Sequence, residues 1–233
     1  IKKRIFVLIL ILFNFLIFSV ILLYLFNYFL SFYYDDNTKL KRYTSKNNIE
    51  YDERSIKQVY NELKQSGKDP VIIFYPSYNQ KFNLSKLNNL VTLSGVSKKL
   101  TVFCRENKKY SLYNSDRYGF NNPDKVWDEK NLEYLFIGDS FVHGSCVDQN
   151  NNVVSKFNKF TNKSALNLGM GGNGPLIELA TLIEYGVKFK PKKVFWFYYE
   201  GNDLQSDLIR EMKDPNLKKY LKKKYSNNLI YKQ

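Results

Sequence analysis

The stretch FIGDSFVHGSC, residues 136–146, places a serine, an aspartate and a histidine directly after an apolar run. Ser140 follows Gly138 and Asp139, so its hydroxyl would stand on the turn that ends a strand, as a nucleophile of acyl transfer requires. A serine hydroxyl needs a base to take its proton, and His143 is the single histidine of the chain. Gly-Asp-Ser is also a common turn and helix cap, so this stretch alone leaves a structural role open.

Two further loops carry residue types suited to the same chemistry. The glycine-rich GMGGNG, residues 169–174, allows a backbone amide to point into a site, although such runs also form plain strand-to-helix turns. In EGNDL, residues 200–204, Asn202 offers a side-chain amide while Asp203 holds the loop, or the pair forms an Asx turn that caps the next helix. Together with a serine nucleophile, such groups could stabilise the oxyanion of a tetrahedral intermediate.

An alternation of strand and helix patterns predicts where these loops lie. From residue 131 on, the apolar runs EYLFIG, SALNLG and KKVFWFYYEG predict three strands, separated by predicted helices at 147–160 and 175–188. This order indicates an α/β fold with a doubly wound, flavodoxin-like parallel sheet and right-handed crossovers. Ligands of such sheets bind at the carboxyl ends of the strands, and all three loops leave those ends.

The three loops, in this order, resemble those of the SGNH (GDSL-type) hydrolase family in its membrane-anchored bacterial form. The resemblance lies in GDS at 138–140, NLGMGG at 167–172 and GND at 201–203, and it covers about residues 131–210. Members of the family hydrolyse or transfer acyl groups of esters, including O-acetyl groups of polysaccharides, through an acyl-enzyme.

The resemblance implies a role for each motif residue. Ser140 would be the catalytic nucleophile, and the backbone amides of Ser140 and Gly172 with the side chain of Asn202 would form the oxyanion hole. Asp139 and Asp203 would support the two loops. We expect no cofactor, and no metal, because a single histidine makes a metal site improbable.

The family's fourth motif, an aspartate and a histidine three residues apart, does not occur in the chain, and only three of the family's usual five strands are present. We therefore expect a C-terminally incomplete domain whose catalytic histidine lies beyond Gln233. His143 stays open as the base, or as a site-lining or capping residue. Without a base, the alternative is a catalytically inactive SGNH-like protein that binds or assembles surface polysaccharide.

A dinucleotide site is a further alternative, because Gly169, Gly171 and Gly174 spell G-x-G-x-x-G between a strand and a helix, with Glu200 at the end of the next strand. The motif follows the second predicted strand rather than the first, and Pro175 suits a plain turn. Nicotinamide cofactors are also not expected outside the cytoplasm, and the N-terminal segment described next predicts that these loops lie outside it.

The N-terminus predicts a membrane anchor at residues 1–34. Residues 5–30 carry no charge and are long enough for the roughly 30 Å hydrocarbon core of a bilayer, whereas a signal peptide has an apolar core of only about 7–15 residues. Positive charges at residues 2–4 precede the span and YYDDN follows it, which favours a cytoplasmic N-terminus. We expect a single-pass protein of the inner (cytoplasmic) membrane with its catalytic domain in the periplasm.

Residues 35–130 are predicted to be a spacer and a mixed α/β accessory region ahead of the partial hydrolase-like domain at 131–233. The spacer, residues 31–50, is polar and loop-like, and helical spacing of apolar residues predicts a helix within 52–67. The run PVIIFYPSY predicts a short strand, and the rest consists of loops and short strands. The sequence leaves the function of residues 50–130 open, and a link between Cys104 and Cys146 would favour a lid or scaffold against the site.

Cys104 and Cys146 are a disulfide candidate in an oxidising compartment, with two buried free thiols as the alternative. The net charge of +14 comes mostly from scattered lysine without a compact basic motif, so we expect no nucleic acid partner. The lysine-rich run at 217–228 is predicted to be the solvated face of a helix, and weak attraction to anionic lipid or polysaccharide stays open. The expected partners are the membrane and an acyl-ester or glycan substrate.

Overall fold

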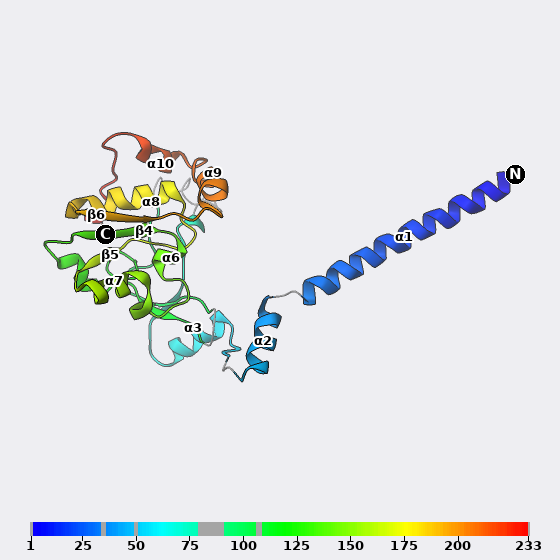
Figure 1. The fold of residues 1–233 in the computed structure, drawn as a ribbon, viewed down its shortest axis with the longest axis horizontal. Helices are drawn as coiled ribbons and strands as arrows, with labels where there is room; N and C mark the ends of the chain where they lie inside the picture. Colours follow the sequence, from blue (N-terminus) through cyan, green and yellow to red (C-terminus); the bar gives the residue numbers. More distant parts are fainter. Residues whose placement is uncertain (1, 34–35, 49–50, 79–90, 106–108, 233) are drawn as a thin grey trace. The chain divides into compact units, whose positions relative to one another are not determined.

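The structure is a computed structural model that describes residues 2–33, 36–48, 51–78, 91–105 and 109–232 (Figure 1). It divides into two compact units, Ile1–Asp52 and Glu53–Gln233. The expected accessory region and the expected hydrolase-like domain therefore belong, from residue 53 on, to one compact unit.

The first unit contains the helices α1 (Lys2–Tyr33) and α2 (Asp36–Lys46). Within α1, Lys3–Ser31 has a mean hydropathy of 3.2 and is long and apolar enough to cross a membrane. Its polar side chains bond to carbonyl groups one turn earlier, Asn14 Nδ2 to Leu10 O at 2.8 Å and Ser19 Oγ to Phe15 O at 2.9 Å. These bonds satisfy donors that hydrocarbon could not.

The prediction of a loop for residues 31–50 is wrong where α2 forms. The sequence of α2, DNTKLKRYTSK, contains neither glycine nor proline. Lysine, leucine and arginine favour helices, so its polarity does not prevent a helix from forming.

The second unit is built on a three-stranded parallel sheet, which confirms the three predicted parallel strands. The sheet has the order β5-β4-β6, formed by β4 (Tyr134–Gly138), β5 (Ala165–Asn167) and β6 (Lys193–Phe197). Both neighbours pair with β4 in parallel register. The carboxyl ends of all three strands therefore lie at one edge of the sheet.

Helices cover both faces of this sheet (Figure 1). Leu135 and Ile137 belong to the core beneath α8 (Pro175–Thr181), and Phe136 packs with residues of α7 (Val153–Thr161) on the opposite face. Alternate residues of a strand point to opposite faces, which explains this division. At the edge of the sheet, β6 keeps Val194 and Trp196 exposed, at 39% and 55%.

The helix expected at 147–160 begins later than predicted. The chain after β4 first forms the single turn α6 (Ser140–His143), which ends at Gly144 with a φ of +81°. A 3-10 turn follows, and α7 begins only at Val153, where the Asn152 side chain accepts the Ser155 amide at 2.8 Å. A capping residue thus sets the start that the apolar pattern did not reveal.

The helix expected at 175–188 is present, as α8 followed by a π-helical turn and a 3-10 turn that end at Phe189. The solvated helix predicted at 217–228 is mostly wrong. Helix α10 (Pro215–Lys218) and a 3-10 turn end at Leu221, and Leu217 and Tyr220 are buried in the core. Buried Glu184 accepts the Tyr220 hydroxyl at 2.8 Å and the Leu229 amide at 2.7 Å, which holds this segment down on the core.

A second small sheet precedes the parallel one, with the order β1-β2-β3, where β1 pairs in parallel and β3 antiparallel with β2. Its elements are α3 (Ile56–Gln65), β1 (Pro70–Ile72), β2 (Leu100–Val102) and β3 (Leu112–Asn114). The helix predicted within 52–67 is confirmed, and a capping box between Ser55 and Gln58 starts it. Parts of the predicted loop region, 79–90 and 106–108, lie outside the described residues.

Within the described residues, the elements not yet named with their bounds are one α-helix and seven short 3-10 or π-helical turns. They are η1 (Asp124–Asp128), η2 (Gln149–Asn151), η3 (Leu182–Gly186), η4 (Val187–Phe189), η5 (Asp203–Asp207), α9 (Leu208–Glu211), η6 (Lys219–Leu221) and η7 (Leu229–Tyr231).

A disulfide joins Cys104, which follows β2, to Cys146, which follows α6. It links the accessory sheet to the segment that carries Ser140, across a sequence separation of 42 residues. A cross-link of this span stabilises mainly by restricting the unfolded chain.

We expect reduction of this disulfide to lower the free energy of unfolding of the second unit by about 4 kcal/mol. Urea unfolding of the full chain in detergent, followed by the emission of Trp127 and Trp196, measures the difference between oxidised and reduced protein. A Cys104→Ser/Cys146→Ser variant is the control and should not respond to the reductant. An unchanged unfolding midpoint on reduction of the native chain would contradict the expectation.

Candidate functional site

Ser140, Gly172 and Asn202 each follow the carboxyl end of one of the three parallel strands. Contacts between their loops hold them at one edge of the sheet. The ring of Phe141, next to Ser140, lies 5.7 Å from the ring of Tyr199 on the third loop. The three predicted loops therefore gather where the topology places them.

The glycine loop packs directly onto α6. A Cβ atom on Gly169 would lie 2.6 Å from the His143 amide nitrogen and 2.6 Å from Val142 Cβ, so only glycine allows this approach. Asn167 fixes the start of the loop, since its Nδ2 donates to Val142 O at 2.8 Å and its Oδ1 accepts from the Gly169 amide at 2.9 Å. The nucleophile turn and the glycine loop thus form one packed assembly.

Ser140 is partly exposed at the start of α6. Its hydroxyl donates to Asp139 Oδ2 at 3.3 Å, and Asp139 Oδ1 accepts the Phe141 amide at 3.2 Å. Burial raises the pKa of Asp139, and the negative charge of nearby Asp207 raises it further. Asp139 therefore both caps the turn and accepts the hydrogen bond of the Ser140 hydroxyl.

A helix dipole contributes little at Ser140. Helix α6 spans only four residues, and Gly144 ends it. A single turn aligns few peptide dipoles, so individual amide groups rather than a macrodipole carry the electrostatics here.

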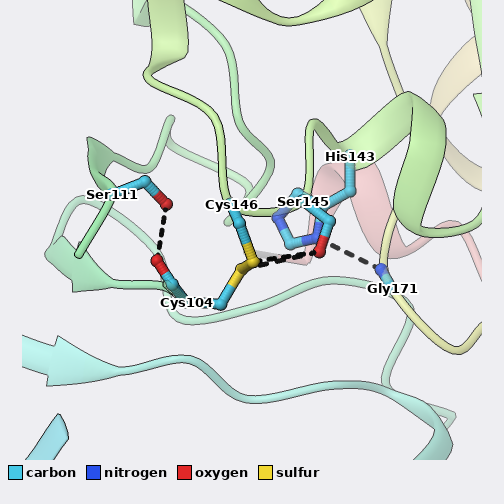
Figure 2. Close-up of a disulfide and its surroundings, with 6 residues drawn as sticks. All are labelled: Cys104, Ser111, His143, Ser145, Cys146 and Gly171. Atoms are coloured by element: carbon cyan, nitrogen blue, oxygen red, sulfur yellow. Dashed lines mark hydrogen bonds between the residues drawn. A yellow bond between two sulfur atoms is a disulfide. The ribbon is translucent and has the colours of Figure 1, made fainter. Parts of the chain in front are cut away.

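His143 cannot serve as the base for Ser140 in this arrangement. Its side chain is fully buried and lies between rings, 4.3 Å from the Phe103 centroid and 5.5 Å from that of Tyr113. Its Nδ1 accepts the Gly171 amide at 3.1 Å, which Figure 2 shows beside the disulfide, and its Nε2 lies 3.1 Å from the Tyr113 hydroxyl. Both ring nitrogens are occupied within the protein.

These two bonds define the protonation of the ring. Because Nδ1 accepts a hydrogen bond from the Gly171 amide, the neutral ring must carry its proton on Nε2 and donate a hydrogen bond to the Tyr113 hydroxyl. Burial without a neighbouring carboxylate lowers the pKa of His143 to about 3. His143 is thus a neutral, structural residue of the site.

The amide groups of the glycine loop are almost all used inside the protein. Within residues 169–177 the amide nitrogens donate to carbonyl oxygens, to Asn167, to His143 or to Glu211, and Pro175 has none. The exception in the described part of the chain is the amide of Gly172, which has a φ of +73°. Its N–H remains available to a ligand.

The Ser140 amide also has no acceptor among the described residues. Two of the three donors that the resemblance implies, the Ser140 and Gly172 amides, are therefore unpartnered at the same edge of the sheet. An oxyanion hole requires donors that are free before the substrate binds.

Asn202 directs its side chain to Asp207, with Nδ2 donating to Asp207 Oδ2 at 2.6 Å. An amide NH₂ group carries two protons, so one proton remains for a ligand. Asp203 Oδ2 accepts the Tyr199 amide at 2.7 Å, a bond within the third loop. Burial raises the pKa of Asp203, and the charges of Asp139 and Asp207 add to this.

The dinucleotide alternative fails at the start of α8, where a pyrophosphate would need free amide groups. Buried Glu211 occupies them, with Oε1 accepting the Gly174 amide at 2.5 Å and Oε2 accepting the Leu176 amide at 2.8 Å. A carboxylate supplied by the chain itself stands where the phosphate would bind. Glu200, the expected ribose ligand, is exposed.

The accessory region forms part of the site. Asn122 pairs with both backbone groups of Asn167, its Nδ2 donating to the carbonyl at 2.8 Å and its Oδ1 accepting the amide at 2.9 Å. Asn121 Nδ2 donates to His143 O at 2.9 Å. The packing of Tyr75 and Ser77 against Gly171 and Gly172 adds a further contact, since a Cβ on either glycine would lie within 3 Å of them.

Glu178 lies buried in α8, close enough to Asp203, Glu211 and Asp139 to respond to their charges. Its Oε2 accepts the Trp196 indole N–H at 2.6 Å, and its Oε1 meets no partner among the described residues. Burial raises the pKa of Glu178 to about 8. This carboxyl group is therefore largely protonated at neutral pH.

The sequence patterns did not predict that Tyr113, Asn121, Asn122, Glu178, Asp207 and Glu211 contribute to the site. Asn121 and Asn122 lie in a stretch that reads as turn-rich, and their partners are more than 20 residues away in the chain. No group of histidine, cysteine and acidic residues suited to a metal occurs within the described residues.

We expect the single imidazole of the chain to stay neutral from pH 4.5 to 8, because its pKa is about 3. The ¹⁵N spectrum of histidine-labelled protein should show the Nε2–H tautomer throughout this range. No other histidine contributes to the spectrum, so the signal needs no assignment. Titration near pH 6.5 would contradict the buried arrangement.

We expect stability to fall as the pH rises from about 4.5 towards 8, because folding raises the pKa of Glu178 from 4.5 to about 8. Below pH 4.5 the group is protonated in both states, and above pH 8 folding must bury a charge. Glu178→Gln keeps an acceptor for the Trp196 indole but carries no charge. It should therefore remove the fall in the free energy of unfolding between pH 4.5 and 8, which we expect to be on the order of a few kcal/mol.

Thermal unfolding of native and variant chains at pH 4.5 and pH 9 measures this effect. Glu62→Gln, a substitution of an exposed carboxyl, is the control and should leave the pH dependence unchanged. Equal pH dependence in native protein and Glu178→Gln would contradict the expectation.

Comparison of the chain with models of known protein families, with curated proteins and with solved structures finds no match. The SGNH resemblance therefore remains a prediction that rests on the three motifs and their order.

Proposed function

We propose that the chain is a membrane-anchored serine esterase or O-acyltransferase of the SGNH type. It would act outside the cytoplasm on acyl esters of cell-surface glycans, O-acetyl esters first among them. The observation that carries this proposal is that the amides of Ser140 and Gly172 have no acceptor among the described residues and follow the carboxyl ends of neighbouring parallel strands. The other amides of the glycine loop already have acceptors within the protein, so the amide of Gly172 is the one this loop can offer to a substrate.

The proposed reaction has two steps. Ser140 Oγ loses its proton and bonds to the acyl carbon, and the carbon–oxygen bond to the glycan then breaks, with a proton passing to the departing oxygen. Water or another hydroxyl group next attacks the acyl-enzyme and releases Ser140. In both steps the amides of Ser140 and Gly172 and the second Asn202 proton would stabilise the oxyanion.

The proton acceptor limits the rate in this proposal. Among the described residues, Asp139 is the acceptor bonded to the Ser140 hydroxyl, and a carboxylate is a weaker base than imidazole. Since His143 is buried, we expect slow acylation by the chain itself and faster acylation when imidazole is added as a surrogate base.

The location outside the cytoplasm has two supports. Lys2, Lys3 and Arg4 precede the apolar helix and acidic residues follow it, which favours a cytoplasmic N-terminus by the positive-inside rule. The Cys104–Cys146 disulfide suits an oxidising compartment such as the periplasm. The partners in this proposal are the membrane, through α1, and an ester-bearing glycan.

The second candidate is a catalytically inactive SGNH-like protein that binds or assembles surface polysaccharide. The full burial of His143 favours it, because the one imidazole of the chain cannot take the proton of Ser140. In that case the free amides would bind a glycan carboxylate or carbonyl group without chemistry.

Labelling of the full chain in detergent with a fluorophosphonate probe separates the two candidates. The esterase should react at Ser140, and faster with imidazole. Ser140→Ala should abolish labelling, and Asn202→Ala should slow it by on the order of 10² to 10³. Ser145→Ala, a nearby serine that contacts the disulfide, is the matched control and should label normally.

Labelling that persists after Ser140→Ala would contradict the proposed nucleophile. A folded chain that does not label even with imidazole would favour the binding protein over the esterase.

A further inference from the structure

We propose that Arg210 is a positioning residue of the oxyanion hole, which holds both the glycine loop and the Asn202 turn and neutralises the charge between them. This inference rests on the proposed function. The guanidinium group donates through Nη1 to Asp207 Oδ1 at 2.7 Å and through Nη2 to Gly172 O at 2.9 Å. One side chain of α9 therefore contacts two of the three loops.

The first effect is on the Gly172 amide. The Gly171 amide, just before it, is bonded to His143 Nδ1, and the Gly172 carbonyl, just after it, is bonded to Arg210. The peptide unit that carries the free N–H thus lies between two fixed groups. Because glycine has the widest backbone freedom, a Gly172 without these anchors would sample many orientations of this N–H.

The second effect is on Asn202. Asp207 accepts Asn202 Nδ2 at 2.6 Å through one carboxylate oxygen and Arg210 through the other. This bond fixes the plane of the Asn202 side-chain amide, and with it the direction in which the second Nδ2 proton points. Arg210 acts on this donor through Asp207 rather than by contact.

The third effect is electrostatic. Asp207 is 4% exposed, and a buried carboxylate beside an oxyanion would oppose the negative charge that develops there. The ion pair with Arg210 offsets that charge. Burial also raises the pKa of two neighbouring carboxyls, Asp139 and Asp203.

The test uses the full chain in detergent with imidazole and a fluorophosphonate, and separates the maximal inactivation rate from the probe's dissociation constant. We expect Arg210→Gln to lower the rate by about tenfold or more while the dissociation constant stays within about twofold. Arg210→Lys keeps the positive charge but not both hydrogen bonds, so its maximal inactivation rate should lie between those of the native chain and Arg210→Gln.

Asp207→Asn in the Arg210→Gln background removes the uncompensated charge and should restore part of the lost rate. Arg54→Gln, which removes an exposed pair with Glu62, is the control and should react normally. An unchanged rate in Arg210→Gln, or a loss seen only in the dissociation constant, would overturn the proposal.

A second measurement separates this proposal from the esterase itself. If the native chain does not label, the ¹⁵N–¹H signals of the Asn202 side chain and the Gly172 amide still report the anchoring. Arg210→Gln should shift both signals, whereas Arg54→Gln should shift neither. Signals unchanged by Arg210→Gln would refute the anchoring whether or not the chain is an enzyme.

Discussion

The hydrogen bonds of the buried, neutral His143 are the interaction on which the arrangement of the site depends. The residue lies on the turn that carries Ser140, accepts the Gly171 amide from the glycine loop and donates to Tyr113 on the accessory sheet. Three separate segments therefore meet at one ring. Because the ring is fully buried, each of these bonds must be made, or a polar group would be left without a partner at a cost of about 1–3 kcal/mol.

The carboxyl groups near the site fall into two classes according to what surrounds them. Asp207 pairs with an arginine. Glu211 accepts three backbone amides, yet burial still raises its pKa to about 7. Glu178 has one indole donor, and its pKa rises to about 8. Protonation and ion pairing are two ways to reduce the cost of burying a carboxyl group, and both occur near the site.

The sequence predicted those features that local patterns control. Apolar runs gave the three parallel strands, and their order placed Ser140, Gly172 and Asn202 at one edge. The start of α7 was missed because a cap at Asn152, rather than the apolar pattern, determines it. The contacts of Asn122 with Asn167 and of Arg210 with Gly172 join residues 45 and 38 positions apart, and no short-range pattern reports such pairs.

The use of amide donors decides which chemistry this edge of the sheet can support. A glycine-rich turn before a helix would suit a phosphate group if its amides were free, but Glu211 already accepts the amides of Gly174, Leu176 and Ile177. With those donors consumed, the amide left on the described part of this loop is that of Gly172, and one donor is too few for a pyrophosphate. In the acyl transfer proposed for Ser140 the oxyanion presents a single oxygen, which matches the one donor that this loop leaves.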